Sequence, residues 1–120
     1  MSKEANIAKT DNWFVGEDRT FIFTVNNAAD SGAENITGWA LEWVLRKDAD
    51  ATAAIITKTV AGGGITIPVG TDGKANVLVL DDDTVNLEPG TYYHTLRRTD
   101  GGQETVLSFG TATLRRGSTR

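Results

Sequence analysis

Hydrophobic and polar residues alternate with a period of two along most of this chain, and almost no segment repeats hydrophobic residues at the helical spacing. The clearest case is residues 38–46. One face of this segment carries Trp39, Leu41, Trp43 and Leu45, and the other face carries smaller or charged residues. Alternation of this kind is typical of a strand with one face in a protein core. The segment is therefore predicted to be a strand with a heavy buried face.

Six further segments show β-type alternation or enrichment in β-branched and aromatic residues, at 19–25, 55–60, 65–67, 75–80, 91–99 and 104–114. Glycine-containing segments separate several of them and predict a break or bulge at 62–64 and tight hairpin turns at 71–74 and 100–102. Seven or eight short strands without intervening helices predict an all-β fold, an antiparallel β-sandwich. One short helical turn is expected near residues 81–87, whose acidic start suits a helix N-terminus.

Residues 87–93, Leu-Glu-Pro-Gly-Thr-Tyr-Tyr, indicate which kind of sandwich this is. A Tyr at the start of a strand, directly after a Pro-Gly turn, can return its hydroxyl to the preceding backbone, as in the tyrosine corner of immunoglobulin-like domains. Either Tyr92 or Tyr93 can form this corner. We expect Tyr92 in the core, because its face of the strand also carries Leu96.

The chain of 120 residues has the size of one domain, and 39% hydrophobic residues suffice for a sizeable core. Its 17 Thr and 13 Gly, a quarter of the residues, suit strand faces and turns. We expect a polar N-terminal arm at 1–12, an immunoglobulin-like β-sandwich at 13–114 and a basic C-terminal tail at 115–120.

The charge is unevenly distributed along the chain. Residues 1–96 carry 7 Lys and Arg against 14 Asp and Glu, whereas residues 97–120 carry 5 Arg against 2 acidic residues. The simplest interpretation of a net charge of −4 is solubility. A second interpretation is a head-to-tail contact in which Arg115, Arg116 and Arg120 meet an acidic neighbour. Nucleic-acid binding is disfavoured, because an overall acidic chain lacks the basic footprint that phosphate contacts require.

Residues able to perform chemistry are few, and we expect no enzyme activity, cofactor or metal. The absence of Cys excludes disulfides and thiolate sites, and a lone His94 cannot supply a His-Glu-x-x-His motif. His94 is expected in the core or on a strand surface. No Ser lies in a Gly-x-Ser-x-Gly elbow. The acidic run at 81–83 lacks the spacing of a calcium loop and is expected to be a solvated helix start.

Two further expectations concern the surroundings of the chain. No segment has the apolar length of a signal peptide or a membrane span, so we expect neither standard secretion nor a membrane partner. Trp13 and Phe14 follow the polar arm, where they can either close the end of the sandwich or anchor on a partner protein.

The linear pattern of turns and core positions resembles the small immunoglobulin-like domains of tailed bacteriophages, in particular the N-terminal domain of phage baseplate upper proteins. The resemblance spans about residues 13 to 114. The segments that carry it are 16–21, 37–41, 58–60, 83–93 and 107–114.

This resemblance implies a non-enzymatic virion protein of the tail, baseplate or neck, made in the host cytoplasm and present in symmetric copies that bind other virion proteins. Two departures from the family are visible. The helical and receptor-binding parts that follow the domain in baseplate proteins do not follow before Arg120, and His94 stands where relatives place an aromatic residue. A capsid decoration protein and a carbohydrate- or receptor-binding module of the virion therefore remain as alternatives.

Overall fold

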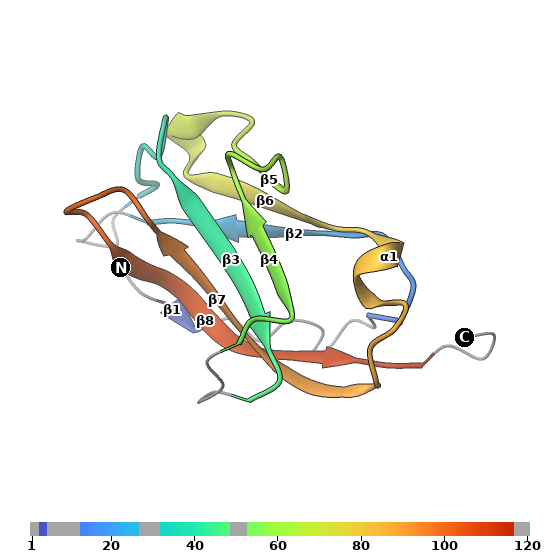
Figure 1. Cartoon of the computed structure of the whole chain (residues 1–120). Helices are drawn as coiled ribbons and strands as arrows, with labels where there is room; N and C mark the ends of the chain where they lie inside the picture. Colours follow the sequence, from blue (N-terminus) through green and yellow to red (C-terminus); the bar gives the residue numbers. More distant parts are fainter. Residues whose placement is uncertain (1–2, 5–12, 27–31, 49–52, 117–120) are drawn as a thin grey trace.

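Two sheets pack face to face in the structure, a computed structural model that describes residues 3–4, 13–26, 32–48 and 53–116 (Figure 1). Strands dominate the described residues. The elements are β1 Lys3–Glu4, β2 Arg19–Thr24, β3 Leu41–Arg46, β4 Ile56–Thr59, β5 Ile65–Thr66, the short 3-10 turn η1 Gly70–Asp72, β6 Lys74–Val79, α1 Asp81–Thr84, β7 Gly90–Arg98 and β8 Thr105–Leu114.

The larger sheet has the strand order β1-β8-β7-β3-β4, and the smaller has the order β2-β6-β5. All neighbours are antiparallel except β1 and β8, which run parallel. In the immunoglobulin fold, strands G, F, C and C′ form one sheet and strands B, E and D belong to the other, which is the order seen here. The predicted all-β sandwich, its seven strand segments and the helical turn at α1 are confirmed.

Within the expected N-terminal arm at 1–12, Lys3–Glu4 form β1, a pairing too short to leave a periodic pattern in the sequence; residues 5–12 lie outside the described residues. One local prediction is corrected. The tight turn expected at 71–74 is instead η1 followed by Gly73, which has a left-handed φ of 67°. A Cβ at Gly73 would lie 2.5 Å from the Val25 carbonyl oxygen, so only glycine fits.

Trp43 of β3 lies at the centre of the core and connects the two sheets. Its ring centroid is 6.2 Å from that of Phe21 on β2 and 6.1 Å from that of His94 on β7. His94 in turn lies 5.6 Å from Phe23 on β2. In antibody domains a Trp on the equivalent strand packs against a disulfide, whose second Cys follows the corner Tyr by two residues. Phe23 and His94 occupy that place here, which accounts for a sandwich without Cys.

Lys58 and Asp83 join the two sheets at their edge. Lys58 lies on β4, the last strand of the larger sheet, and its Nζ is 2.7 Å from Oδ2 of Asp83 in α1. The same oxygen accepts a hydrogen bond of 2.8 Å from the backbone N–H of Leu80, which precedes the helix. Asp83 therefore fixes both the start of α1 and the position of β4 against it.

We expect Asp83→Ala to lower the free energy of unfolding by about 1–2 kcal/mol, because one half-buried carboxylate provides both the ion pair and the bond to Leu80. Urea unfolding followed by circular dichroism measures the change. Asp82→Ala is the matched control, since Asp82 is exposed, and it should change the free energy by less than about 0.5 kcal/mol. Equal effects of the two substitutions would contradict this role of Asp83.

Candidate functional site

His94, the one imidazole of the sequence, is part of the core of the sandwich. His94 is only 1% exposed, and its Nδ1 accepts a hydrogen bond of 3.3 Å from Nε1 of Trp43. Of the two positions expected for His94, the core and a strand surface, the structure shows the core. In the described part of the chain, His, Asp and Glu form no group of three that could hold a metal ion. Within the same ranges, no helix reaches the length and apolarity needed to cross a membrane.

Tyr92, rather than Tyr93, forms the tyrosine corner. Its ring is buried, Nζ of Lys47 lies 4.7 Å from the ring centroid, and its hydroxyl donates a hydrogen bond to the backbone carbonyl of Glu88. Burial, followed by the nearby charge of Glu88, raises the pKa of Tyr92 above its ordinary value of 10.0. Tyr93 points to the opposite side of the sheet and is 37% exposed.

We expect Tyr92→Phe to lower the free energy of unfolding by about 0.5–1.5 kcal/mol, the usual net contribution of one hydrogen bond. The raised pKa means that the unfolded chain loses the phenol proton before the folded chain does. Stability from this group is therefore complete below pH 10.0 and lost as the pH rises through the folded-state pKa. Chemical unfolding between neutral and alkaline pH should show this decline in the wild type. Tyr92→Phe should lack it, whereas the control Tyr93→Phe should retain it.

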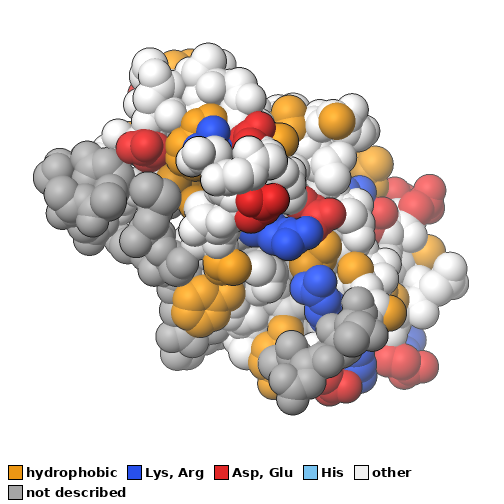
Figure 2. Space-filling view, turned by 60° about the vertical axis from the view of Figure 1, so that its left-hand side comes forward, with side chains coloured by type: hydrophobic (Ala, Val, Ile, Leu, Met, Phe, Trp, Pro, Cys, Tyr) orange, Lys and Arg blue, Asp and Glu red, His pale blue; other side chains and the backbone are white. Residues whose placement is uncertain are grey.

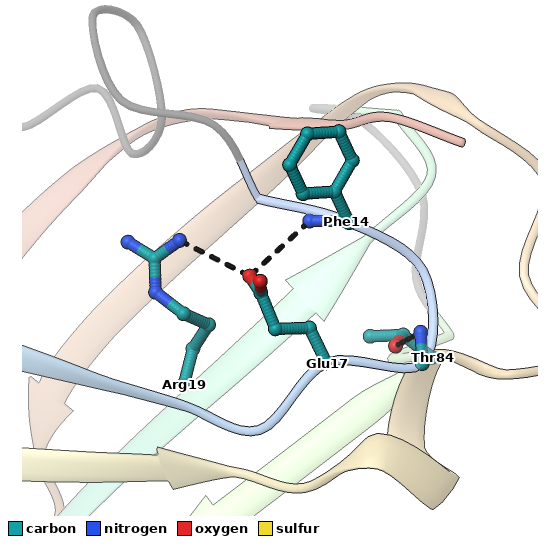
Figure 3. A network of polar contacts seen from close by, with 5 residues as sticks. Phe14, Glu17, Arg19 and Thr84 are labelled. Carbon is teal, nitrogen blue, oxygen red and sulfur yellow. Dashed lines mark hydrogen bonds and ion pairs between the residues drawn. The ribbon is translucent and has the colours of Figure 1, made fainter. Parts of the chain in front are cut away.

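The segment that leads into β2 is held by a network of polar contacts, one of which reaches α1 (Figure 3). The Thr84 hydroxyl, which is buried, accepts a hydrogen bond of 2.8 Å from the Gly16 N–H. The Glu17 carboxylate accepts bonds from the Phe14 N–H at 3.5 Å and from Arg19 at 3.3 Å. Two motifs of the linear pattern, 16–21 and 83–93, therefore meet in space.

The structure brings together three of the residues that were predicted to bind a partner. The backbone carbonyl of Arg115 accepts a hydrogen bond of 2.8 Å from the Val15 N–H, and the Arg115 N–H donates one of 2.8 Å to the Trp13 carbonyl. These two bonds place Phe14 beside the end of β8. Arg115 and Arg116 are exposed, whereas Arg120 lies outside the described residues.

Trp13 is a core residue, so the expectation that its side chain binds a partner is corrected. The ring is fully buried and packs edge-on against Phe21, with centroids 5.1 Å apart. It closes the end of the sandwich. Phe14, its neighbour, is half-buried and remains a candidate contact residue at this end of the molecule.

The face of the molecule shown in Figure 2 carries hydrophobic side chains in small groups between basic and acidic ones. Among the described residues, the large hydrophobic side chains that are exposed are Ile22, Ile55, Val69, Leu80, Val85, Tyr93, Val106 and Phe109. Three of these, Tyr93, Val106 and Phe109, belong to β7 and β8, the two strands with the longest pairing in the fold. This side of the larger sheet is therefore a candidate binding surface.

A pocket of about 290 Å³, here called the sheet pocket, lies on the outer face of the larger sheet. Its lining residues are Arg46 of β3, Tyr93, His94 and Thr95 of β7, and Phe109, Gly110 and Thr111 of β8. Tyr93 pairs with Arg46 on one side and with Thr111 on the other, while Thr95 pairs with Phe109. Tyr93 and Phe109 are thus diagonal neighbours, 37% and 43% exposed.

Arg46 gives the sheet pocket a positive charge. Its side chain is half-buried, and within the described residues no ion pair or side-chain hydrogen bond engages its guanidinium. Arg97, two rows further along the same face, differs in this respect because its Nε lies 3.0 Å from Oε1 of Glu42. Arg46 is therefore available to an acidic group on a ligand or partner.

A second pocket, of about 470 Å³, lies at the loops that precede β3 and β8. Arg98 covers the Trp39 ring at 3.9 Å and bonds through Nε to Asp100 at 2.7 Å. Asp100 also accepts a bond of 3.0 Å from the Ala40 N–H. These bonds, the one from Arg98 foremost, lower the pKa of Asp100. The bonds of Asp100 fix the two loops to each other, and Arg98 occupies one face of the Trp39 ring.

Comparison with models of known protein families and with characterised proteins finds no match for this chain. The candidate site therefore rests on the geometry described above.

Proposed function

We propose that this chain is a non-enzymatic structural protein of a tailed-bacteriophage virion, of the tail, baseplate or neck adaptor type, which binds neighbouring virion proteins. The observation that carries the proposal is the sheet pocket, which combines two exposed aromatic rings with an available Arg46. Aromatic residues and Arg are the side chains enriched at protein interfaces and among their strongest contacts. His94, the only imidazole of the chain, serves the core instead.

The fold agrees with what the resemblance to phage domains implies. The strand order is that of an immunoglobulin-like sandwich, and the tyrosine corner lies in the segment that carries much of the resemblance. The contact between Gly16 and Thr84 gives a physical reason for two of its motifs to occur together. The content of purified virions tests the proposal directly.

Purified particles of the phage that encodes the chain provide that experiment. Quantitative mass spectrometry should find the protein in the particles, in about 6–18 copies for a tail, baseplate or neck position with closed symmetry. Hundreds of copies would favour the alternative of a capsid decoration protein. Absence from purified particles that retain all other structural proteins would overturn the proposal.

A carbohydrate- or receptor-binding module is the second candidate, and the Tyr93–Phe109 pair favours it. Exposed aromatic faces stack on sugar rings, and Thr95 and Thr111 place hydroxyl groups in the same pocket. A glycan array with the purified protein tests this function. Binding that disappears in Tyr93→Ala and persists in Val106→Ala would support it, and an array without any binding would count against it.

A further inference from the structure

A second surface, here called the α1 corner, carries features complementary to those of the sheet pocket. It consists of Asp18, Leu80, Asp81, Asp82 and Val85 at one end of the sandwich (Figure 1). Leu80 and Val85 are each 51% exposed, although both are large hydrophobic residues. All three carboxylates are exposed as well. An apolar and acidic surface of this kind is complementary to a pocket that is apolar and basic.

The α1 corner is held in place before any partner binds. The Asp81 N–H donates a hydrogen bond of 2.6 Å to Asp18, and Asp83 fixes the backbone of Leu80. The sheet pocket is similarly rigid, because paired strands supply all of its lining residues. Little conformational freedom is lost when two such surfaces associate, which favours binding.

We propose that the sheet pocket binds the α1 corner of a second copy of this chain, with Leu80 or Val85 against Tyr93 and Phe109 and an acidic residue against Arg46. The inference rests on the proposed function, since it identifies a partner surface for a virion protein present in several copies. Charge complementarity carries it: the pocket has an available cation, and the corner has three exposed carboxylates.

The two surfaces determine the geometry of the assembly. The sheet pocket lies on the outer face of the larger sheet, whereas α1 follows β6 of the smaller sheet. Contact between two different surfaces is heterologous and leaves one of each free at the ends of a dimer. Such contacts continue until they close into a ring or extend as a filament. A symmetric pocket-to-pocket dimer would instead bring two Arg46 side chains toward each other.

A charge-exchange experiment tests the contact. Arg46→Glu should repel the acidic corner, and the double variant Asp81→Lys with Asp82→Lys should repel the basic pocket. Each variant alone should associate roughly tenfold or more weakly than the wild type. In sedimentation velocity or light scattering, each should approach the 12.9 kDa monomer at concentrations where the wild type associates. An equimolar mixture should regain association, because the acidic pocket of Arg46→Glu then meets the basic corner of the double variant.

Lys74→Glu is the matched control, since it reverses one exposed charge on the smaller sheet and should leave association unchanged. Circular dichroism establishes that all variants are folded. A wild-type protein that stays monomeric throughout, charge variants that associate as the wild type does, or a mixture that stays monomeric would each overturn the proposal. A glycan that binds the monomer and is lost in Arg46→Glu would identify a sugar as the occupant and likewise overturn it.

The outcome is separable from that of the proposed function. Detection of the protein in purified virions, together with failure of the charge exchange, removes only the head-to-tail contact. Association through these surfaces by a protein absent from virions removes the virion assignment and leaves the contact intact.

Discussion

Replacing Trp43 with Ala is expected to lower the free energy of unfolding by about 3–5 kcal/mol, the range found for large aromatic residues in protein cores. The indole is fully buried and connects Phe21 of the smaller sheet to His94 of the larger one, so its loss leaves a cavity between the sheets. Because the free energy of unfolding of a typical domain is only about 5–15 kcal/mol, this substitution removes a large part of it. Urea denaturation at neutral pH measures the change.

The control for this prediction is Trp39→Ala, because Trp39 occurs four residues earlier in the same alternating segment. Trp39 is only half-buried and precedes β3, so its removal should cost about 1–2 kcal/mol. Trp43→Phe adds a further comparison. This substitution retains an aromatic ring but removes the N–H that donates to His94. The buried Nδ1 of His94 then lacks this hydrogen bond. Similar losses for Trp39→Ala and Trp43→Ala would contradict the central position of Trp43.

Period-two alternation predicted this core because each strand turns one face toward the opposite sheet. Leu41, Trp43 and Leu45 are all buried, and their position follows from the side-chain period of a strand alone. The corner formed by Tyr92 was also predictable, since a Pro-Gly turn fixes where β7 begins. Local patterns therefore determined the strands and the class of sandwich.

The sheet pocket was not predictable in the same way, because three strands supply its residues. Period-two alternation places Tyr93 and Thr95 on one face of their strand, but their neighbours depend on strand order and register. A register shift between Leu96 and Arg97 interrupts the pairing of β7 with β8. Counting outward from the turn at 100–102 therefore misplaces Phe109 by one position, onto the opposite face.

Trp13 illustrates a different limit of sequence reasoning, since it lies in no alternating strand. Its position is fixed by the two backbone hydrogen bonds that join Trp13 and Val15 to Arg115 at the end of β8. This pairing brings residues from distant parts of the sequence into contact, and no local pattern records it.

Trp13→Ala should lower the free energy of unfolding by about 3–5 kcal/mol, because the ring is fully buried against Phe21. Trp13→Phe should be much milder, about 1 kcal/mol, and milder than Trp43→Phe. The Trp13 Nε1 has no hydrogen-bond partner in the described structure, so its removal eliminates an unsatisfied buried donor and partly offsets the lost volume.

Parallel urea denaturation of the Ala and Phe variants at positions 13 and 43 provides the measurement. Trp13→Ala with wild-type stability and weakened association with a partner protein would show that Trp13 is a binding residue after all. Loss of stability in Trp13→Ala, together with a smaller loss in Trp13→Phe than in Trp43→Phe, would show that the Trp13 ring only fills space, whereas the Trp43 N–H also binds His94. The comparison thus separates packing from hydrogen bonding within a single core, using the same substitution at both positions.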